Sequence, residues 1–143
     1  MKNVNEVMGN YLNHDYIVKI FNDGHRTGYV KIDNPEIFNK IKNDYCTFSC
    51  EIDCHGGLTF VESVKNSPFL PDGNWVGFDC AHDGDIPDKE GAEAHFKETN
   101  FFFVFHRFDS FYGSVKTKQF VETECKGIIH QIIEMTGKNF IGE

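Results

Sequence analysis

The chain has 143 residues, of which 40% are hydrophobic and 15% aromatic. It is therefore large and apolar enough to fold as one domain over residues 1–143, and too apolar to be disordered. Its formal net charge is −8, from 22 acidic and 14 basic residues, which excludes the broad basic face that a duplex-nucleic-acid-binding protein needs.

The N-terminal third predicts a helix followed by a hairpin. Apolar residues within 2–13 recur at helical spacing, which predicts a short N-terminal helix that forms an arm over residues 1–14. Residues 16–21 are rich in β-branched and aromatic side chains, and residues 22–24 read Asn-Asp-Gly, a turn sequence. The second strand of the hairpin is predicted at residues 27–32.

A short helix and an extended segment come next. Asn34 and Pro35 are a cap and a first helical residue, and the helix is predicted to end near Ile41. Residues 46–61 favour an extended chain that is interrupted by two glycines. Alternation predicts one face turned to the core (Cys50, Ile52, Cys54) and one polar face (Glu51, Asp53, His55).

The C-terminal half predicts two more strands and a long helix. Strands are expected at residues 75–80 and 100–108, with a turn or two of helix within 88–97. The clearest helix covers residues 114–135 and is expected to stop at Gly137. Its buried stripe is predicted to be Val121, Cys125, Ile128, Ile129 and Ile132. The fold class is therefore α+β: an antiparallel sheet of about five strands packed against a long C-terminal helix.

The five cysteines and the N-terminal residues bear on the compartment. An odd number of cysteines without an apolar leader predicts reduced thiols in the cytosol. The longest strongly apolar run, residues 101–105, is far too short to span a bilayer, so no membrane partner is expected.

Two polar blocks lie where strands are expected to end. His55 is followed by Gly56 and Gly57, and glycines permit positive φ and close approach of a ligand to the main chain. The same pair would also suit a simple bulge or tight turn. Residues 79–85 leave a strand and contain His82 between aspartates, although Asp and Gly are also ordinary turn formers. We predict that the two blocks meet and line one concavity.

Three kinds of chemistry are open to this pair of blocks. His55, His82 and an aspartate could bind zinc or manganese, but their spacing matches no strong signature, so neither a metal nor another cofactor is predicted. A histidine beside an aspartate could shuttle a proton, without an identifiable Ser or Cys nucleophile because Cys54 and Cys80 are expected to face the core.

The third possibility is a binding pocket without turnover. Aromatic side chains could stack a base, unless they are plain core residues: Tyr29, Phe60, Trp75 and Phe78. The chain has only two arginines, Arg26 and Arg107, and either could hold a phosphate through both guanidinium nitrogens. Asp79 or Asp85 could accept hydrogen bonds from ribose hydroxyls.

Three sequence blocks resemble those of a family of small phage and prophage proteins. They read GHRTGYV at residues 24–30, HGGLTF at 55–60 and WVGFDCAHDGD at 75–85, and residues 121–131 are similar to the closing helix of that family. The resemblance covers roughly residues 24–134; its second and third blocks are specific, and its first is loose. Most members of the family have no assigned role.

In size and layout the chain also resembles the Thoeris anti-defence sponge proteins. Those proteins bind cyclic ADP-ribose isomers and withhold them from the immune effector. The resemblance implies a homo-oligomer with nucleotide pockets near subunit contacts. It further implies that Arg26 and Arg107 hold phosphate and that Phe78 stacks the adenine.

The function expected from the sequence is a phage-type anti-defence protein of the host cytosol. It would bind and sequester a nucleotide immune signal rather than act as an enzyme. The predicted ligand-binding set is Arg26, Tyr29, His55, Gly56, Gly57, Trp75, Phe78, Asp79, His82, Asp85 and Arg107. One alternative is a nucleotide or cyclic-nucleotide hydrolase that uses the His/Asp cluster. The other is a protein–protein inhibitor of a host defence factor, presenting the acidic surface or the Phe-rich segment at residues 101–111.

Overall fold

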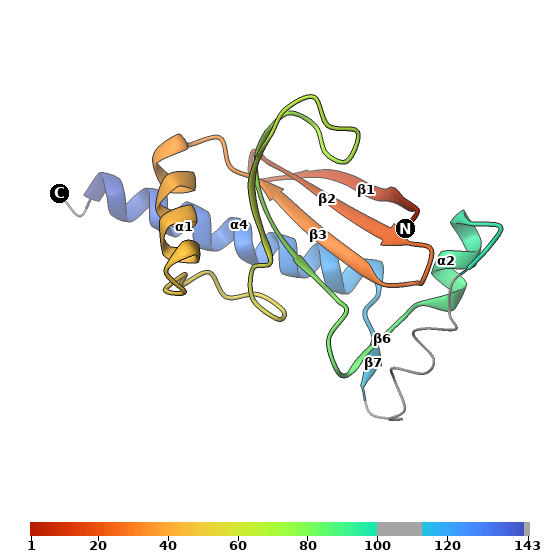
Figure 1. The fold of residues 1–143 in the computed structure, drawn as a ribbon. Coiled ribbons are helices and arrows are strands. Elements are labelled where there is room, and N and C mark those ends of the chain that lie inside the picture. The colour runs from red at the N-terminus through yellow and green to blue at the C-terminus, as the bar shows by residue number, and fades with distance from the viewer. Residues whose placement is uncertain (100–112, 142–143) are drawn as a thin grey trace.

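Five antiparallel strands form one sheet, and a long helix packs across one of its faces (Figure 1). The computed structural model describes residues 1–99 and 113–141. Along the sheet the order is β1-β2-β3-β5-β4. The strands are β1 (Asn3–Tyr11), β2 (His14–Phe21), β3 (Arg26–Lys31), β4 (Phe60–Val64) and β5 (Gly73–Asp79). The predicted α+β class is confirmed.

The helices and two short strands complete the fold. The helices are α1 (Pro35–Cys46), α2 (Lys89–His95) and α4 (Lys118–Ile141). The strands β6 (Asp85–Ile86) and β7 (Ser114–Val115) pair in parallel beside the main sheet. Within residues 1–99 and 113–141, no helix is long and apolar enough to cross a membrane. The strand predicted at residues 100–108 lies outside the described residues.

The predicted N-terminal helix is wrong, because this segment is strand β1, paired with β2 along its length. Leu12 and Asn13 both have positive φ, at 49° and 66°, and so form a two-residue hairpin turn of the kind that suits the twist of paired strands. The register shifts at a bulge between Asn5 and Val7. Val4 and Val7 consequently face the same side although they lie three residues apart, which imitates helical spacing.

The core lies between the sheet and α4. The predicted stripe is confirmed, since all five side chains are at most 1% exposed: Val121, Cys125, Ile128, Ile129 and Ile132. Gly28 of β3 lets the helix approach, because a Cβ there would lie 2.7 Å from Phe78 and 2.8 Å from the Cys125 sulfur. The opposite face carries a smaller core under the loop that connects β4 and β5: Ile17, Tyr29, Leu70 and Trp75.

The bounds of both larger helices differ from the prediction. Asn34 caps α1 as expected by accepting hydrogen bonds from two main-chain amides, but the helix continues past Ile41 to Cys46. Helix α4 begins at Lys118, because the residues before it pair with β6, and it passes through Gly137. One glycine costs a helix only about 1 kcal/mol, which does not stop it without a capping turn.

The segment between α1 and β4 is extended only at its end. Of residues 46–61, Cys46 ends α1 and the strand begins at Phe60. The predicted alternation nevertheless holds, because Ile52 is buried and Cys50 and Cys54 pack against the core, whereas the polar side chains Glu51 and Asp53 are exposed. This irregular segment carries His55 to the end of β5.

Candidate functional site

The two polar blocks lie side by side, and α4 holds the first of them in place. The amide of His55 donates to Glu124 Oε1 at 2.8 Å. The side chain of Gln131 makes two further bonds of 2.7 Å, accepting from the amide of Asp53 and donating to its carbonyl. These bonds fix the main chain on both sides of Cys54, so α4 positions the imidazole of His55 as well as filling the core.

The two glycines after His55 have different surroundings. Both have positive φ, at 69° for Gly56 and 79° for Gly57, and the Gly57 amide closes a tight turn on the Cys54 carbonyl at 2.9 Å. A Cβ at Gly56 would lie 2.7 Å from Nε2 of His82, whereas a Cβ at Gly57 would meet nothing within 4 Å. The first block therefore interlocks with the second at Gly56 and leaves open space at Gly57.

The carboxylate of Asp85 lies at the centre of the site and is only 2% exposed. It accepts from Nε2 of His55 at 2.8 and 2.9 Å, and from the amide and Nδ1 of His82 at 3.0 and 3.2 Å. The ammonium of Lys116 lies 3.6 Å away. Burial alone would raise the pKa of Asp85, but the hydrogen bonds from His55 and His82 outweigh it and hold the pKa below its usual range.

An ionised Asp85 determines which nitrogens carry protons. A carboxylate can only accept hydrogen bonds, so Nε2 of His55 and Nδ1 of His82 must both donate. The other nitrogen of each ring, Nδ1 of His55 and Nε2 of His82, then remains available for proton transfer. Nε2 of His82 lies 3.6 Å from the carboxylate of Asp79, and Nδ1 of His55 makes no hydrogen bond to any described residue.

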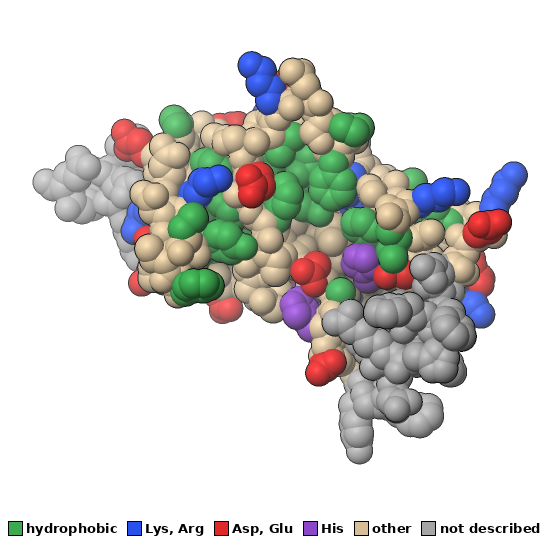
Figure 2. Space-filling view, in the orientation of Figure 1, with side chains coloured by type: hydrophobic (Ala, Val, Ile, Leu, Met, Phe, Trp, Pro, Cys, Tyr) green, Lys and Arg blue, Asp and Glu red, His purple; other side chains and the backbone are tan. Residues whose placement is uncertain are grey.

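Both imidazoles are accessible from solvent. The His55 side chain is 23% exposed and that of His82 38%. Their rings pack edge-on with centroids 5.6 Å apart, and the Phe120 ring covers the other side of His55. In Figure 2 histidine and acidic side chains lie near one another on the face shown. The arrangement therefore places two oriented imidazoles and one ammonium around a buried anion.

A transition metal would fit this cluster by distance. One ligand atom each from His55, His82 and Asp85 lies within 4.8 Å of the others, and three protein ligands are typical of catalytic zinc sites. The Asp85 carboxylate, however, already accepts hydrogen bonds from three donors of His55 and His82, and the Lys116 ammonium lies 3.6 Å away as its ion-pair partner. The donor set therefore favours a hydrogen-bonded cluster over a metal centre.

Arg26, predicted to hold phosphate, is used inside the protein instead. Its side chain is 3% exposed and donates to Glu6 at 2.7 Å, to Asp88 at 2.8 Å and to the carbonyl of Lys116 at 3.0 Å. The buried guanidinium is thus bonded to partners inside the protein, which does not favour the predicted role. Arg107, the other predicted phosphate ligand, lies outside the described residues.

Three of the four aromatic residues predicted to stack a base are in the core, and the fourth, Phe60, is partly buried against the smaller core. Tyr29 is 5% exposed, Trp75 and Phe78 are each 1% exposed, and the Trp75 indole donates to the carbonyl of Pro71. None of these three rings is exposed, so the structure favours the alternative that they are core residues. Cys54 and Cys80 pack in the core as predicted, and burial raises the pKa of each to about 12, so neither thiol is an activated nucleophile.

Sequence reasoning missed the residues that hold the site from behind. Glu124 and Gln131 anchor the His55 segment, and Lys116 approaches Asp85 from the short connection between β7 and α4. Glu124 and Gln131 are seven residues apart, which places them on one face of a helix, beside the buried stripe. The sequence signal that could have indicated Glu124 and Gln131 was the presence of two hydrogen-bonding side chains at the border of an apolar stripe. No sequence signal indicated Lys116.

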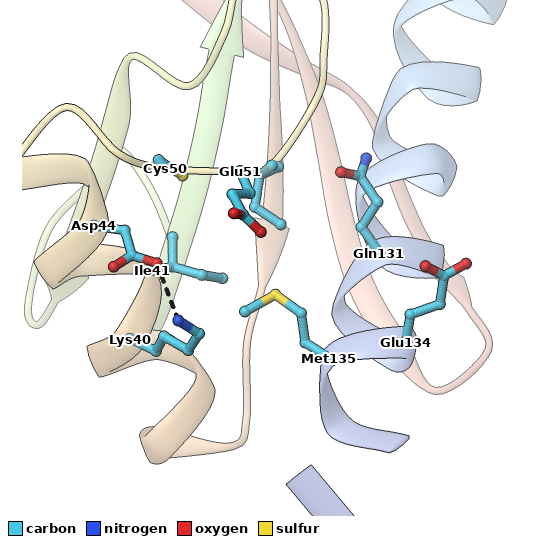
Figure 3. A pocket seen from close by; sticks show the side chains of 9 residues that line it. Lys40, Ile41, Asp44, Cys50, Glu51, Gln131, Glu134 and Met135 are labelled. Atoms are coloured by element: carbon cyan, nitrogen blue, oxygen red, sulfur yellow. Dashed lines mark hydrogen bonds and ion pairs between the residues drawn. The ribbon is translucent and has the colours of Figure 1, made fainter. Parts of the chain in front are cut away.

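Two hollows lie near the site, and they differ in charge. The first, of about 210 Å³, lies between α1 and α4. Figure 3 shows Glu51 and Glu134 at its rim, with Asp44 paired to Lys40, so its lining does not suit an anionic ligand. The second, of about 520 Å³, lies beside Gly57 and has no charged side chain in its lining.

Comparison with protein-family models, with curated proteins and with solved structures gives no significant match to this chain. The functional assignment therefore depends on the geometry of the His55–His82–Asp85 cluster and on the sequence blocks that form it. The predicted homo-oligomer and the predicted anti-defence role remain predictions.

Proposed function

We propose that the protein hydrolyses a phosphoester bond in a nucleotide-like small molecule at the His55–His82–Asp85 cluster. The observation that carries this proposal is that the Asp85 carboxylate accepts a hydrogen bond from each imidazole and so orients both rings. Two imidazoles oriented by one carboxylate can act as a base and an acid within a few ångströms of each other.

The two histidines take different roles because their free nitrogens differ in surroundings. Nδ1 of His55 has no described partner and acts as the base, whereas Nε2 of His82 lies 3.6 Å from the Asp79 carboxylate and acts as the acid. A water molecule attacks phosphorus while its proton passes to His55. The bond from phosphorus to the leaving oxygen breaks as His82, which enters this step as imidazolium with Nδ1 bonded to Asp85, donates its Nε2 proton to that oxygen. When the bond is a phosphodiester, the products are a phosphate monoester and an alcohol, and both groups stay in one molecule if the substrate is cyclic.

Lys116 supplies the positive charge that an anionic substrate requires. Its ammonium lies 3.6 Å from Asp85 and 5.4 Å from the centre of the Phe120 ring, on the His55 side of the cluster. An ammonium at this place offsets charge that builds up on the phosphoryl oxygens during attack. The net charge of −8 does not oppose this role, because local geometry decides the binding of a small anion.

Sequestration without turnover is less well supported than hydrolysis. A tight sponge needs ring faces and phosphate donors that are free to bind. Of the described residues predicted for those roles, Arg26 is paired inside the protein, and Tyr29, Trp75 and Phe78 are buried. Phe60 alone is partly exposed. The resemblance to phage proteins nevertheless makes nucleotide immune signals, including cyclic ADP-ribose isomers, the first compounds to test.

The test separates hydrolysis from sequestration in one experiment. Each nucleotide is incubated with the protein, the protein is heat-denatured, and the supernatant is analysed by chromatography, with and without EDTA. We expect a new product, unaffected by EDTA, whose rate falls at least about 100-fold in His55→Gln and His82→Gln. His130→Gln is the matched control, because this exposed histidine bonds to Tyr11 instead.

Three outcomes would contradict the proposal. Intact nucleotide released on heating would identify a sponge, and loss of activity with EDTA would identify a metal enzyme. If all three glutamine variants retained full activity while His55→Gln and His82→Gln unfolded more easily, the cluster would be a structural clasp between two loops.

A further inference from the structure

The larger hollow is an apolar groove at the C-terminal end of α1. It has a volume of about 520 Å³, within the range of small-molecule sites, and its larger side chains are Tyr45, Phe48, Ile52 and Leu58. The lining includes no acidic, basic or histidine side chain. A charged group would gain nothing in this groove, whereas a flat apolar ring would be in contact with aromatic and aliphatic carbon.

Phe48 stands at a position where glycine is the usual residue. Helix α1 ends with the amide of Phe48 donating to Tyr45 and the amide of Ser49 donating to Asp44, the two bonds of a glycine-type helix end. Phe48 accordingly has φ of +60°, a left-handed conformation that costs a non-glycine residue roughly 1–2 kcal/mol.

The ring of Phe48 contributes no packing that would compensate for this strain, because the residue is 97% exposed. The capping bonds nevertheless fix its main chain, as does a 2.7 Å bond between the hydroxyls of Thr47 and Ser49. An aromatic ring is therefore held at the edge of an apolar groove on a rigid support. Strained and exposed residues of this kind are characteristic of binding sites.

Gly57 connects the groove to the proposed catalytic cluster along the chain. This glycine lines the groove, and space is open where its side chain would be. It is two residues from His55, so their Cα atoms can be at most about 7.6 Å apart. A ligand with a ring in the groove thus has a short path, over a surface without side chains, to the base.

We propose that this groove binds the nucleobase of the substrate and that Phe48 stacks on it. The inference rests on the proposed function, because it places the phosphate of the same molecule at His55, His82 and Lys116. A neutral planar ring fits the uncharged lining, and stacking on an aromatic side chain tolerates any base. The substrate class is accordingly a nucleotide rather than a simple sugar phosphate.

The test compares two probes, AMP and ribose 5-phosphate, which share the phosphate and differ in the base. Affinities are measured by calorimetry for the wild type, Phe48→Gly, Phe48→Tyr and His82→Gln. Phe48→Gly removes the ring and suits the backbone conformation, so it endangers the fold least. We expect the wild type to bind AMP about tenfold more tightly than ribose 5-phosphate, and Phe48→Gly to abolish that difference. Phe48→Tyr should preserve it, and His82→Gln should weaken both probes.

The outcomes distinguish failure of the groove from failure of the site. If AMP binds equally well to the wild type and Phe48→Gly while His82→Gln weakens both probes, the groove is not the base subsite and the proposed function stands. If His82→Gln changes neither affinity, or neither probe binds at millimolar concentration, the proposed function is wrong and the subsite with it.

Discussion

Replacing Asp85 by asparagine tests the centre of the proposed site, because the substitution keeps the shape and removes the charge. The carboxylate receives hydrogen bonds from His55 and His82 and lies 3.6 Å from the Lys116 ammonium, at 2% exposure. Asparagine offers one accepting oxygen, and its NH₂ group would face donors. The three donors that reach Oδ2 from His55 and His82 then either share one uncharged oxygen or face the NH₂ group, so at least one of these bonds is lost and the others are weakened.

The size of the effect follows from the kind of bonds that are lost. A hydrogen bond to a charged group contributes about 1.5–3 kcal/mol, and removing one partner of a buried charged pair costs about 3–5 kcal/mol. Water can replace part of this interaction, because His55 is 23% and His82 38% exposed. We therefore expect Asp85→Asn to lower the free energy of unfolding by about 3 kcal/mol at pH 7, which most domains of this size survive.

The measurement is urea denaturation of the wild type, Asp85→Asn and Asp83→Asn. Asp83 is exposed in the same turn, so its substitution should change stability by less than about 0.5 kcal/mol. The pKa of Asp85 is lower in the folded state than in the unfolded state, so its contribution is present above the unfolded pKa, about 4, and is lost as pH falls through the folded pKa. Equal stability of the two variants at pH 7, or a wild-type advantage that does not shrink as the pH falls below about 4, would refute this account of Asp85.

Three further predictions concern the cluster and the groove. Long-range ¹H–¹⁵N NMR of the neutral rings should find the proton of His55 on Nε2 and that of His82 on Nδ1; the opposite tautomer in either ring would exclude the proposed acid–base roles. Gly56→Ala should cost at least about 2 kcal/mol and abolish turnover, because it adds a clash with His82 to the strain of positive φ. Gly84→Ala is the control, because Gly84 has φ of +88° and no atom within 4 Å of an added Cβ, so this substitution adds backbone strain without a clash and should cost about 1 kcal/mol. Equal losses of unfolding free energy in the two variants would show that the clash with His82 is unimportant. Phe48→Gly should raise the free energy of unfolding by about 0.5 kcal/mol, because the relief of backbone strain exceeds the added entropy of the unfolded chain. A lower free energy of unfolding, measured by urea denaturation, would contradict the claim that Phe48 is strained.

The fold could be predicted where each element has one buried face. The stripe of α4 from Val121 to Ile132 has the period of a helix, and the Asn-Asp-Gly turn before β3 marks a hairpin, so both follow from local chemistry. The N-terminal strand could not be predicted in the same way. Its bulge between Asn5 and Val7 interrupts the alternation, and the sheet edge that stabilises it is supplied by another segment.

The candidate site was predictable in its location but not in its full membership. Glycines after His55 and at the end of the Asp79–Asp85 block marked the two turns, and the structure brings these turns together at Asp85. The aromatic residues were assigned to the wrong environment because both faces of the sheet are covered. Alternation separates two faces, yet it cannot tell whether Tyr29 or Phe78 faces solvent or a second core.

Arg26 connects the stability of the sheet to the proposed site. Its guanidinium bonds to Glu6 of β1, to Asp88 at the start of α2 and to the carbonyl of Lys116, while the ammonium of the same lysine reaches Asp85. A buried arginine that satisfies three separate acceptors fixes their relative positions, because its fork of donors is planar and rigid. The residue that the sequence suggested as a phosphate ligand is thus better understood as the support that places Lys116 where a phosphate would bind.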